Sequence, residues 1–119
     1  MRRQGRRGAK SLRAPRTPTR VELEAMAQAA TIDCYNESEE ITGWFTMIEE
    51  NLATPFETRV LGVMVTVERI ELNQAGQIVA VCSPGRDRQT LPILDLPLPR
   101  LRLVGSEWIE AYRRWLGGR

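Results

Sequence analysis

Histidine is missing from the 119-residue sequence, and cysteine occurs only twice. Histidine is the commonest acid–base catalyst near neutral pH and the commonest ligand of zinc and copper, so its absence argues against most hydrolytic and transition-metal centres. Cys34 and Cys82 match no metal-ligand spacing and form no disulfide framework. Both stand among apolar neighbours, and we therefore predict buried free thiols in a protein of the cytoplasm, a reducing compartment.

Long apolar runs and the common catalytic motifs are also missing. No apolar run approaches the roughly 20 residues that a transmembrane helix needs, and the Arg-rich N-terminus is not followed by the apolar core of a secretory signal. We therefore expect no membrane contact. The sequence has no Gly-rich phosphate loop, no nucleophile elbow, no HExxH motif and no EF-hand loop. Nothing else in so small a domain would hold a substrate, so we expect a non-enzymatic protein.

The two signs of charge are separated along the chain. Residues 1–20 contain no acidic residue. Their eight basic residues are Arg2, Arg3, Arg6, Arg7, Lys10, Arg13, Arg16 and Arg20. The other nine basic and fifteen acidic residues give residues 21–119 a net charge of −6, although the whole chain carries +2.

Residues 1–18 are predicted to be a disordered basic arm, because they combine glycine, proline and like charges with few apolar groups. One interpretation is an interaction module in which the arm binds nucleic acid or another acidic macromolecule. Its candidate contact residues are Arg2, Arg3, Arg6 and Arg7. The other interpretation is a solvated leader, which the lack of interleaved aromatic residues for base stacking favours.

The hydrophobic pattern after the arm predicts two helices, then strands, then one more helix. Thr19 and Asn36 are each followed three residues later by glutamate, which indicates capping boxes at two helix starts, and Ser106 is predicted to cap the last helix. The predicted helices are residues 21–30, 36–52 and 106–116, and the predicted strands are residues 61–68, 77–82 and 89–94. This order is typical of an α+β domain with a small antiparallel sheet, and we expect one monomeric domain over residues 19–117.

An acidic block without counter-charge spans the first two predicted helices. Residues 21–57 contain nine carboxylates and no basic residue. The carboxylates are Glu22, Glu24, Asp33, Glu37, Glu39, Glu40, Glu49, Glu50 and Glu57. Like charges one turn apart destabilise a helix by roughly 0.2–0.5 kcal/mol per pair, and Asp33 and Glu37 are predicted to form such a pair. Near a helix C-terminus, where Glu49 and Glu50 are predicted to lie, the helix dipole disfavours carboxylates further.

A hard divalent cation would relieve this repulsion. Calcium takes about six to eight oxygen ligands, and we predict that Asp33, Glu37 and Glu40 converge at the bend between the two helices. The amide oxygen of Asn36 lies at the same bend. Zinc and copper are disfavoured without histidine or paired cysteines, and magnesium demands a stricter octahedral geometry. Charge alone leaves open a merely solvated acidic face, in which such carboxylates stabilise the first turn of a helix.

One part of the sequence resembles a known protein family. The resemblance rests on the acidic segment 33–40, Gly43-Trp44-Phe45, Ile48-Glu49-Glu50-Asn51-Leu52 and Pro55-Phe56. In order and spacing these segments are similar to those of the small bacterial calcium-binding proteins first known from cyanobacteria, which have no EF-hand. Segments 88–96 and 108–116 resemble the last strand and the C-terminal helix of that family, so the resemblance spans about residues 30–116.

The resemblance implies helices packed on a small, barrel-like antiparallel sheet, with calcium bound on an acidic surface for buffering or signalling. The calcium ligands that it implies are Asp33, Asn36, Glu37, Glu39, Glu40, Glu49 and Glu50. Asn36 and Ser38 stand where the family pattern tends to be acidic, which predicts a weaker site. The basic arm is not part of the family pattern.

Overall fold

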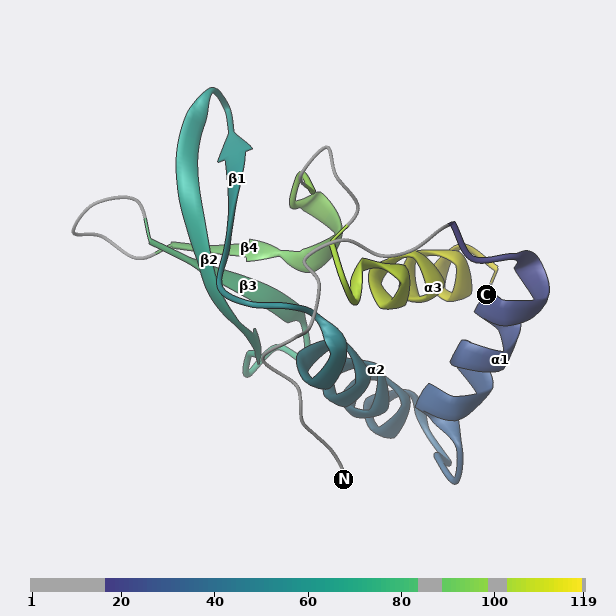
Figure 1. Cartoon of the computed structure of the whole chain (residues 1–119). Coiled ribbons are helices and arrows are strands. Elements are labelled where there is room, and N and C mark those ends of the chain that lie inside the picture. Colours follow the sequence, from purple (N-terminus) through teal and green to yellow (C-terminus); the bar gives the residue numbers. More distant parts are fainter. Residues whose placement is uncertain (1–16, 84–88, 99–102, 119) are drawn as a thin grey trace, which may run out of the picture.

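The computed structural model describes residues 17–83, 89–98 and 103–118 (Figure 1). In chain order its elements are α1 (Arg20–Thr31), α2 (Glu37–Asn51), β1 (Phe56–Val60), β2 (Val63–Leu72), β3 (Ile78–Cys82), β4 (Gln89–Pro92), the 3₁₀ turn η1 (Ile93–Asp95) and α3 (Ser106–Gly117). The sheet occupies one side of the molecule and the three α-helices occupy the other (Figure 1). This arrangement confirms the predicted α+β class.

The four strands form an antiparallel meander in the order β1-β2-β3-β4. The two edge strands, β1 and β4, do not pair with each other, so the described sheet is open and not closed into a barrel. A register shift between Val67 and Arg69 interrupts the pairing of β2 with β3. α2 packs against β2, and α1 contacts both α2 and α3, which places the start of α2 away from the sheet and beside α1 (Figure 1).

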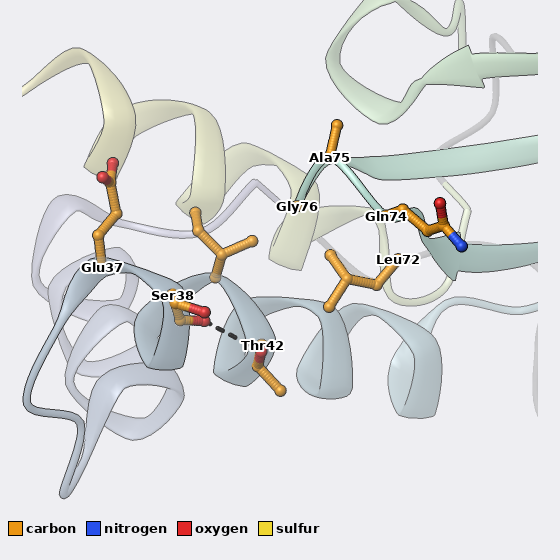
Figure 2. A pocket seen from close by; sticks show the side chains of 8 residues that line it. Glu37, Ser38, Thr42, Leu72, Gln74, Ala75 and Gly76 are labelled. Carbon is orange, nitrogen blue, oxygen red and sulfur yellow. Dashed lines mark hydrogen bonds between the residues drawn. The ribbon is translucent and has the colours of Figure 1, made fainter.

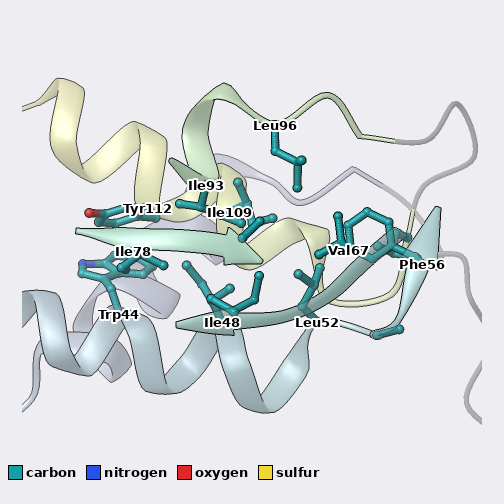
Figure 3. Close-up of a cluster of buried hydrophobic side chains, with 14 of the residues drawn as sticks. Trp44, Ile48, Leu52, Phe56, Val67, Ile78, Ile93, Leu96, Ile109 and Tyr112 are labelled. Carbon is teal, nitrogen blue, oxygen red and sulfur yellow. The ribbon is translucent and has the colours of Figure 1, made fainter. Parts of the chain in front are cut away.

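The hydrophobic core lies between the helices and one face of the sheet (Figure 3). Trp44 of α2 and Val67 of β2 are completely buried. The Trp44 ring lies 5.4 Å from Tyr112, 5.7 Å from Trp115 and 6.3 Å from Trp108, measured between centroids. Aromatic pairs in such tilted or edge-on arrangements add about 0.5–1.5 kcal/mol each beyond burial. This cluster fixes α2 against α3, and with it the segment that carries the acidic block.

The first helix begins as predicted, whereas the last does not. Thr19 Oγ1 accepts a hydrogen bond from the Glu22 N–H at 3.1 Å, and Glu22 Oε1 accepts one from the Thr19 N–H at 2.9 Å. The predicted cap at Ser106 is wrong, because Ser106 is the buried first residue of α3 and Gly105 is its N-cap. Gly105 has a φ of 91°, and a side chain there would overlap the backbone of Asn51. Only glycine satisfies both conditions at this position.

The strand predicted over residues 61–68 is wrong in its first part, because the chain forms a hairpin there. Leu61 and Gly62 have φ values of 51° and 81° and form a two-residue turn that joins β1 to β2. The alternating pattern hid this turn because leucine is not a usual turn residue. The last predicted strand is also shorter, since β4 ends at Pro92 and the chain continues as η1.

Part of the chain lies outside the described residues. Residues 1–16 of the predicted basic arm are outside, and with them the candidate contact residues Arg2, Arg3, Arg6 and Arg7. Among the residues that are described, no helix has both the length and the apolar character needed to cross a membrane.

Candidate metal site

Residues 32–36 form a bend between α1 and α2. α1 ends at Thr31, whose carbonyl accepts a hydrogen bond from the Cys34 N–H at 3.1 Å. Asp33 has a φ of 60°, in the left-handed region that Asp and Asn enter more readily than most residues. Asp33 therefore lies outside both helices, and the predicted one-turn helical repulsion between Asp33 and Glu37 is wrong.

Asn36 and Glu39 tie the bend to the first turn of α2. Asn36 Oδ1 accepts a hydrogen bond from the Glu39 N–H at 2.9 Å, which is the predicted N-cap interaction. Glu39 Oε1 accepts a bond from the Tyr35 N–H at 2.6 Å, so the second capping box closes one residue earlier than predicted. One carboxylate oxygen of Glu39 is thereby held directly against the bend.

Cys34 lies at the bend and is only partly buried, so the predicted full burial of this thiol is wrong. Its thiol is half-buried, and Sγ donates weakly to the carbonyls of Ile32 (3.6 Å) and Glu39 (3.4 Å). Desolvation raises the pKa of this thiol above its ordinary value. The negative charges of Glu39, Glu40 and Asp33 raise that pKa further. Three of the predicted ligands thus act electrostatically on one thiol of the bend. Cys82, in contrast, is buried and free as predicted.

Glu37 faces a different part of the surface. It lies at one end of a groove of about 500 Å³ between α2 and the β2–β3 turn (Figure 2). The groove is lined by Glu37, Ser38, Ile41, Thr42, Leu72, Gln74, Ala75 and Gly76. Glu37 therefore borders a groove that none of the other predicted ligands lines.

Glu49 and Glu50 form a third group near the C-terminal end of α2. Both side chains are exposed. Glu49 lies nine positions after Glu40 in the same helix, which is about 14 Å along the helix axis. A calcium–oxygen distance is only about 2.3–2.6 Å, so one ion does not contact both groups.

Within the described residues, the recorded ion pairs reach only part of the acidic block. Glu24 is paired, with Arg20 at 3.8 Å on the same helix and with Arg114 of α3 at 3.4 Å. Among the described residues no basic side chain forms an ion pair with Asp33, Glu39, Glu40, Glu49 or Glu50. The negative charge at the bend is therefore a property of the folded surface and not only of the sequence.

The donor set at the bend fits a hard cation. Asp33, Glu39 and Glu40 offer two carboxylate oxygens each, the ligand type that calcium prefers, and no nitrogen ligand is present. In the described ranges no three Asp, Glu or Cys side chains already lie close enough to hold a metal ion. Side-chain rotation of these carboxylates, of which Asp33 and Glu39 are exposed and Glu40 is half-buried, would have to complete such a site. The fold and this surface thus define a small α+β protein with an unpaired carboxylate face suited to a hard divalent cation.

Comparison with known proteins identifies the family. Residues 24–116 match the model of the CcbP family, which is described as calcium binding. The match covers most of the chain, and the chain therefore belongs to this family of calcium-binding proteins. This membership confirms the resemblance stated from the sequence and, with it, calcium as the ion and calcium binding as the function.

Two solved structures share the fold. The crystal structure of CcbP from Anabaena is 16% identical, with a TM-score of 0.67 over 87% of this chain and 94% of that chain. A calcium-binding protein in its calcium-binding form is also 16% identical, with a TM-score of 0.65 over 81% of this chain and 90% of that chain. No curated protein matches the chain.

Proposed function

We propose that the bend between α1 and α2 is the main calcium site, with Asp33, Glu39 and Glu40 as its carboxylate ligands. The observation that carries this proposal is that Glu39 is bound to the Tyr35 N–H of the bend, while among the described residues no basic side chain forms an ion pair with Asp33, Glu39 or Glu40. Coulomb repulsion between carboxylates that have no counter-ion is relieved when a divalent cation binds among them.

The other predicted ligands have lesser roles in this proposal. Asn36 contributes a neutral amide oxygen that already accepts the Glu39 N–H. Glu37 lies at the edge of the site, beside the groove, and adds negative charge to it. Glu49 and Glu50 form a separate, weaker group, because two carboxylates supply too few ligands to hold calcium tightly.

The protein in this proposal is a monomeric, non-enzymatic calcium buffer or sensor of the cytoplasm. Its ligands lie on an exposed surface, which suits exchange with free calcium and does not enclose a substrate. The neutral residues Asn36 and Ser38 reduce the charge at the bend, so we expect a weaker site than one with carboxylates at both positions.

A calcium titration followed by amide NMR and calorimetry tests this site. We expect calcium to shift the amide signals of residues 33–40 and magnesium to shift them less. Asp33→Asn combined with Glu40→Gln should weaken calcium binding about tenfold or more. The same change should slightly stabilise the calcium-free protein by removing repulsion. Asparagine also suits the left-handed backbone at position 33.

Glu57→Gln is the matched control, because Glu57 belongs to the same acidic block but lies exposed on β1. Its calcium affinity should equal that of the unmodified protein. A wild-type chain whose residues 33–40 do not respond to millimolar calcium would contradict the proposed site.

A further inference from the structure

Gly43 of α2 lies directly against the backbone of Ala30 in α1. A side chain on Gly43 would overlap the carbonyl oxygen of Ala30 and lie 3.2 Å from its carbonyl carbon. The overlap is with backbone, so no side-chain rotation relieves it. Glycine in the middle of a helix costs roughly 0.5–1 kcal/mol relative to alanine, so packing against Ala30 must compensate for its presence.

This contact holds the end of α1 at the side of α2. Ala30 is 4% exposed, and its carbonyl is one of the last four of α1, which have no partner within the helix. A side chain added to Gly43 would point at this oxygen. In the glycine, a Cα hydrogen takes the place of that side chain and points at the oxygen instead. Such Cα–H···O contacts recur where helices pack closely. The next carbonyl, that of Thr31, accepts the Cys34 N–H and begins the bend.

Cys34 connects the same contact to the carboxylates. A side-chain carbon at Gly43 would lie 3.7 Å from Cys34 Sγ, which itself donates to the carbonyl of Glu39. The bend is thus held on one side by the approach of Gly43 to Ala30 and on the other by Cys34 and the first turn of α2. Asp33, the residue before Cys34, takes its position from both constraints.

We infer that Gly43 is a positioning residue for calcium, since its missing side chain lets α1 approach α2 closely enough to hold the bend, and with it Asp33, at the start of α2. Gly43 itself binds no ion. This inference rests on the proposed calcium site at the bend. It adds that the calcium affinity of this site depends on the distance between α1 and α2 at Gly43, which lies one helical turn beyond Glu39.

The test compares Gly43→Ala with Gly117→Ala in the full chain. Gly117 is a helical glycine of α3 with no atom near the position of an added side chain, so it receives the same chemical change without a contact. We expect Gly43→Ala to weaken calcium binding by roughly tenfold or more, as loss of supporting contacts does at other metal sites. Gly117→Ala should bind calcium like the wild type.

Calcium affinity is measured by calorimetry at a temperature where every variant is fully folded, and the unfolding midpoint is measured separately. A role in stability alone lowers the midpoint and leaves the affinity unchanged, because nearly all molecules are already folded. Ile109→Val, which trims a core residue of α3 that is 2% exposed, provides this comparison. In Gly43→Ala the Tyr35 amide signal should also move, since its N–H bonds to Glu39.

Cys34→Ala tests the same arrangement from the other side and serves if Gly43→Ala does not fold. It removes the sulfur that lies between position 43 and the Glu39 carbonyl, and it should weaken calcium binding several-fold. If folded Gly43→Ala binds calcium with wild-type affinity, the positioning role is overturned and the proposed calcium site is not. If Gly43→Ala does not fold, wild-type affinity in Cys34→Ala has the same consequence. Failure of the wild-type bend to respond to calcium overturns the proposed site itself.

Discussion

Asn36 caps α2, and the proposed site gives the same side chain a second role. Its Oδ1 caps α2 by accepting the Glu39 N–H at 2.9 Å, and in the proposed site the same oxygen faces calcium. An amide oxygen has two lone pairs, so both interactions are compatible, but it carries no charge. The cap is the stronger structural requirement, because loss of an Asn or Asp cap costs about 0.5–2 kcal/mol.

Asn36→Asp should strengthen calcium binding several-fold with little effect on the calcium-free stability. Aspartate caps helices as well as asparagine does, and its charge is favourable at a helix N-terminus, which offsets repulsion from Asp33. Calorimetry and urea unfolding give the two quantities. Gln89→Glu adds the same charge on β4 at the far edge of the sheet and should leave the affinity unchanged. An unchanged affinity in Asn36→Asp would contradict a role for position 36 at the site.

The hairpin between β1 and β2 is the element that local pattern predicted least well. The pairing of Val60 with Val63 leaves two residues, Leu61 and Gly62, both with positive φ, which is the pattern of a type I′ turn. Leu61 is 97% exposed, so no packing compensates for its left-handed backbone. Gly62 was the only local signal of this turn, and the alternation of valines across it outweighed that signal.

Leu61→Asn should stabilise the protein by on the order of 1 kcal/mol, because Asn-Gly is the preferred type I′ pair and a left-handed backbone costs most other residues about 1–2 kcal/mol. Urea unfolding measures the change. Leu61→Ala is the control, since it removes the same exposed side chain and keeps the backbone cost. Equal stability of the two variants would contradict the turn assignment.

Across the whole molecule, charge is distributed unevenly. The domain after residue 20 carries a net −6, and eight basic residues precede it. Long-range pairing relieves part of the acidic block, as when Arg114 of α3 reaches Glu24. No described basic residue reaches the bend, so its charge remains for a cation.

Deletion of residues 1–18 should abolish binding to an acidic macromolecule, because it removes seven of these basic residues and no acidic one. The probe is a short DNA duplex, and binding by the full chain should fall steeply as salt increases. Thr19, the cap of α1, remains, so calcium affinity should not change. Retained DNA binding would contradict the arm as an interaction module, and a rise in calcium affinity would show that the arm competes with calcium.

The sequence by itself determined the ion and the helix starts. The absence of histidine, the nine carboxylates without counter-charge and the family segments are properties of the chain, and the caps at Thr19 and Asn36 depend on neighbours within four residues. Local interactions of this kind are present in any conformation that forms the helix, which is why a pattern predicts them.

Only the tertiary structure decided how the bend that carries Asp33 lies against α2. The left-handed backbone of Asp33 and the close approach of the Ala30 carbonyl to Gly43 set the position of the bend beside α2. Glu37 faces the groove. Periodicity specifies a face of one helix, but the meeting of two helices depends on the direction of the bend and on how closely their backbones pack, and both are set by contacts distant in sequence.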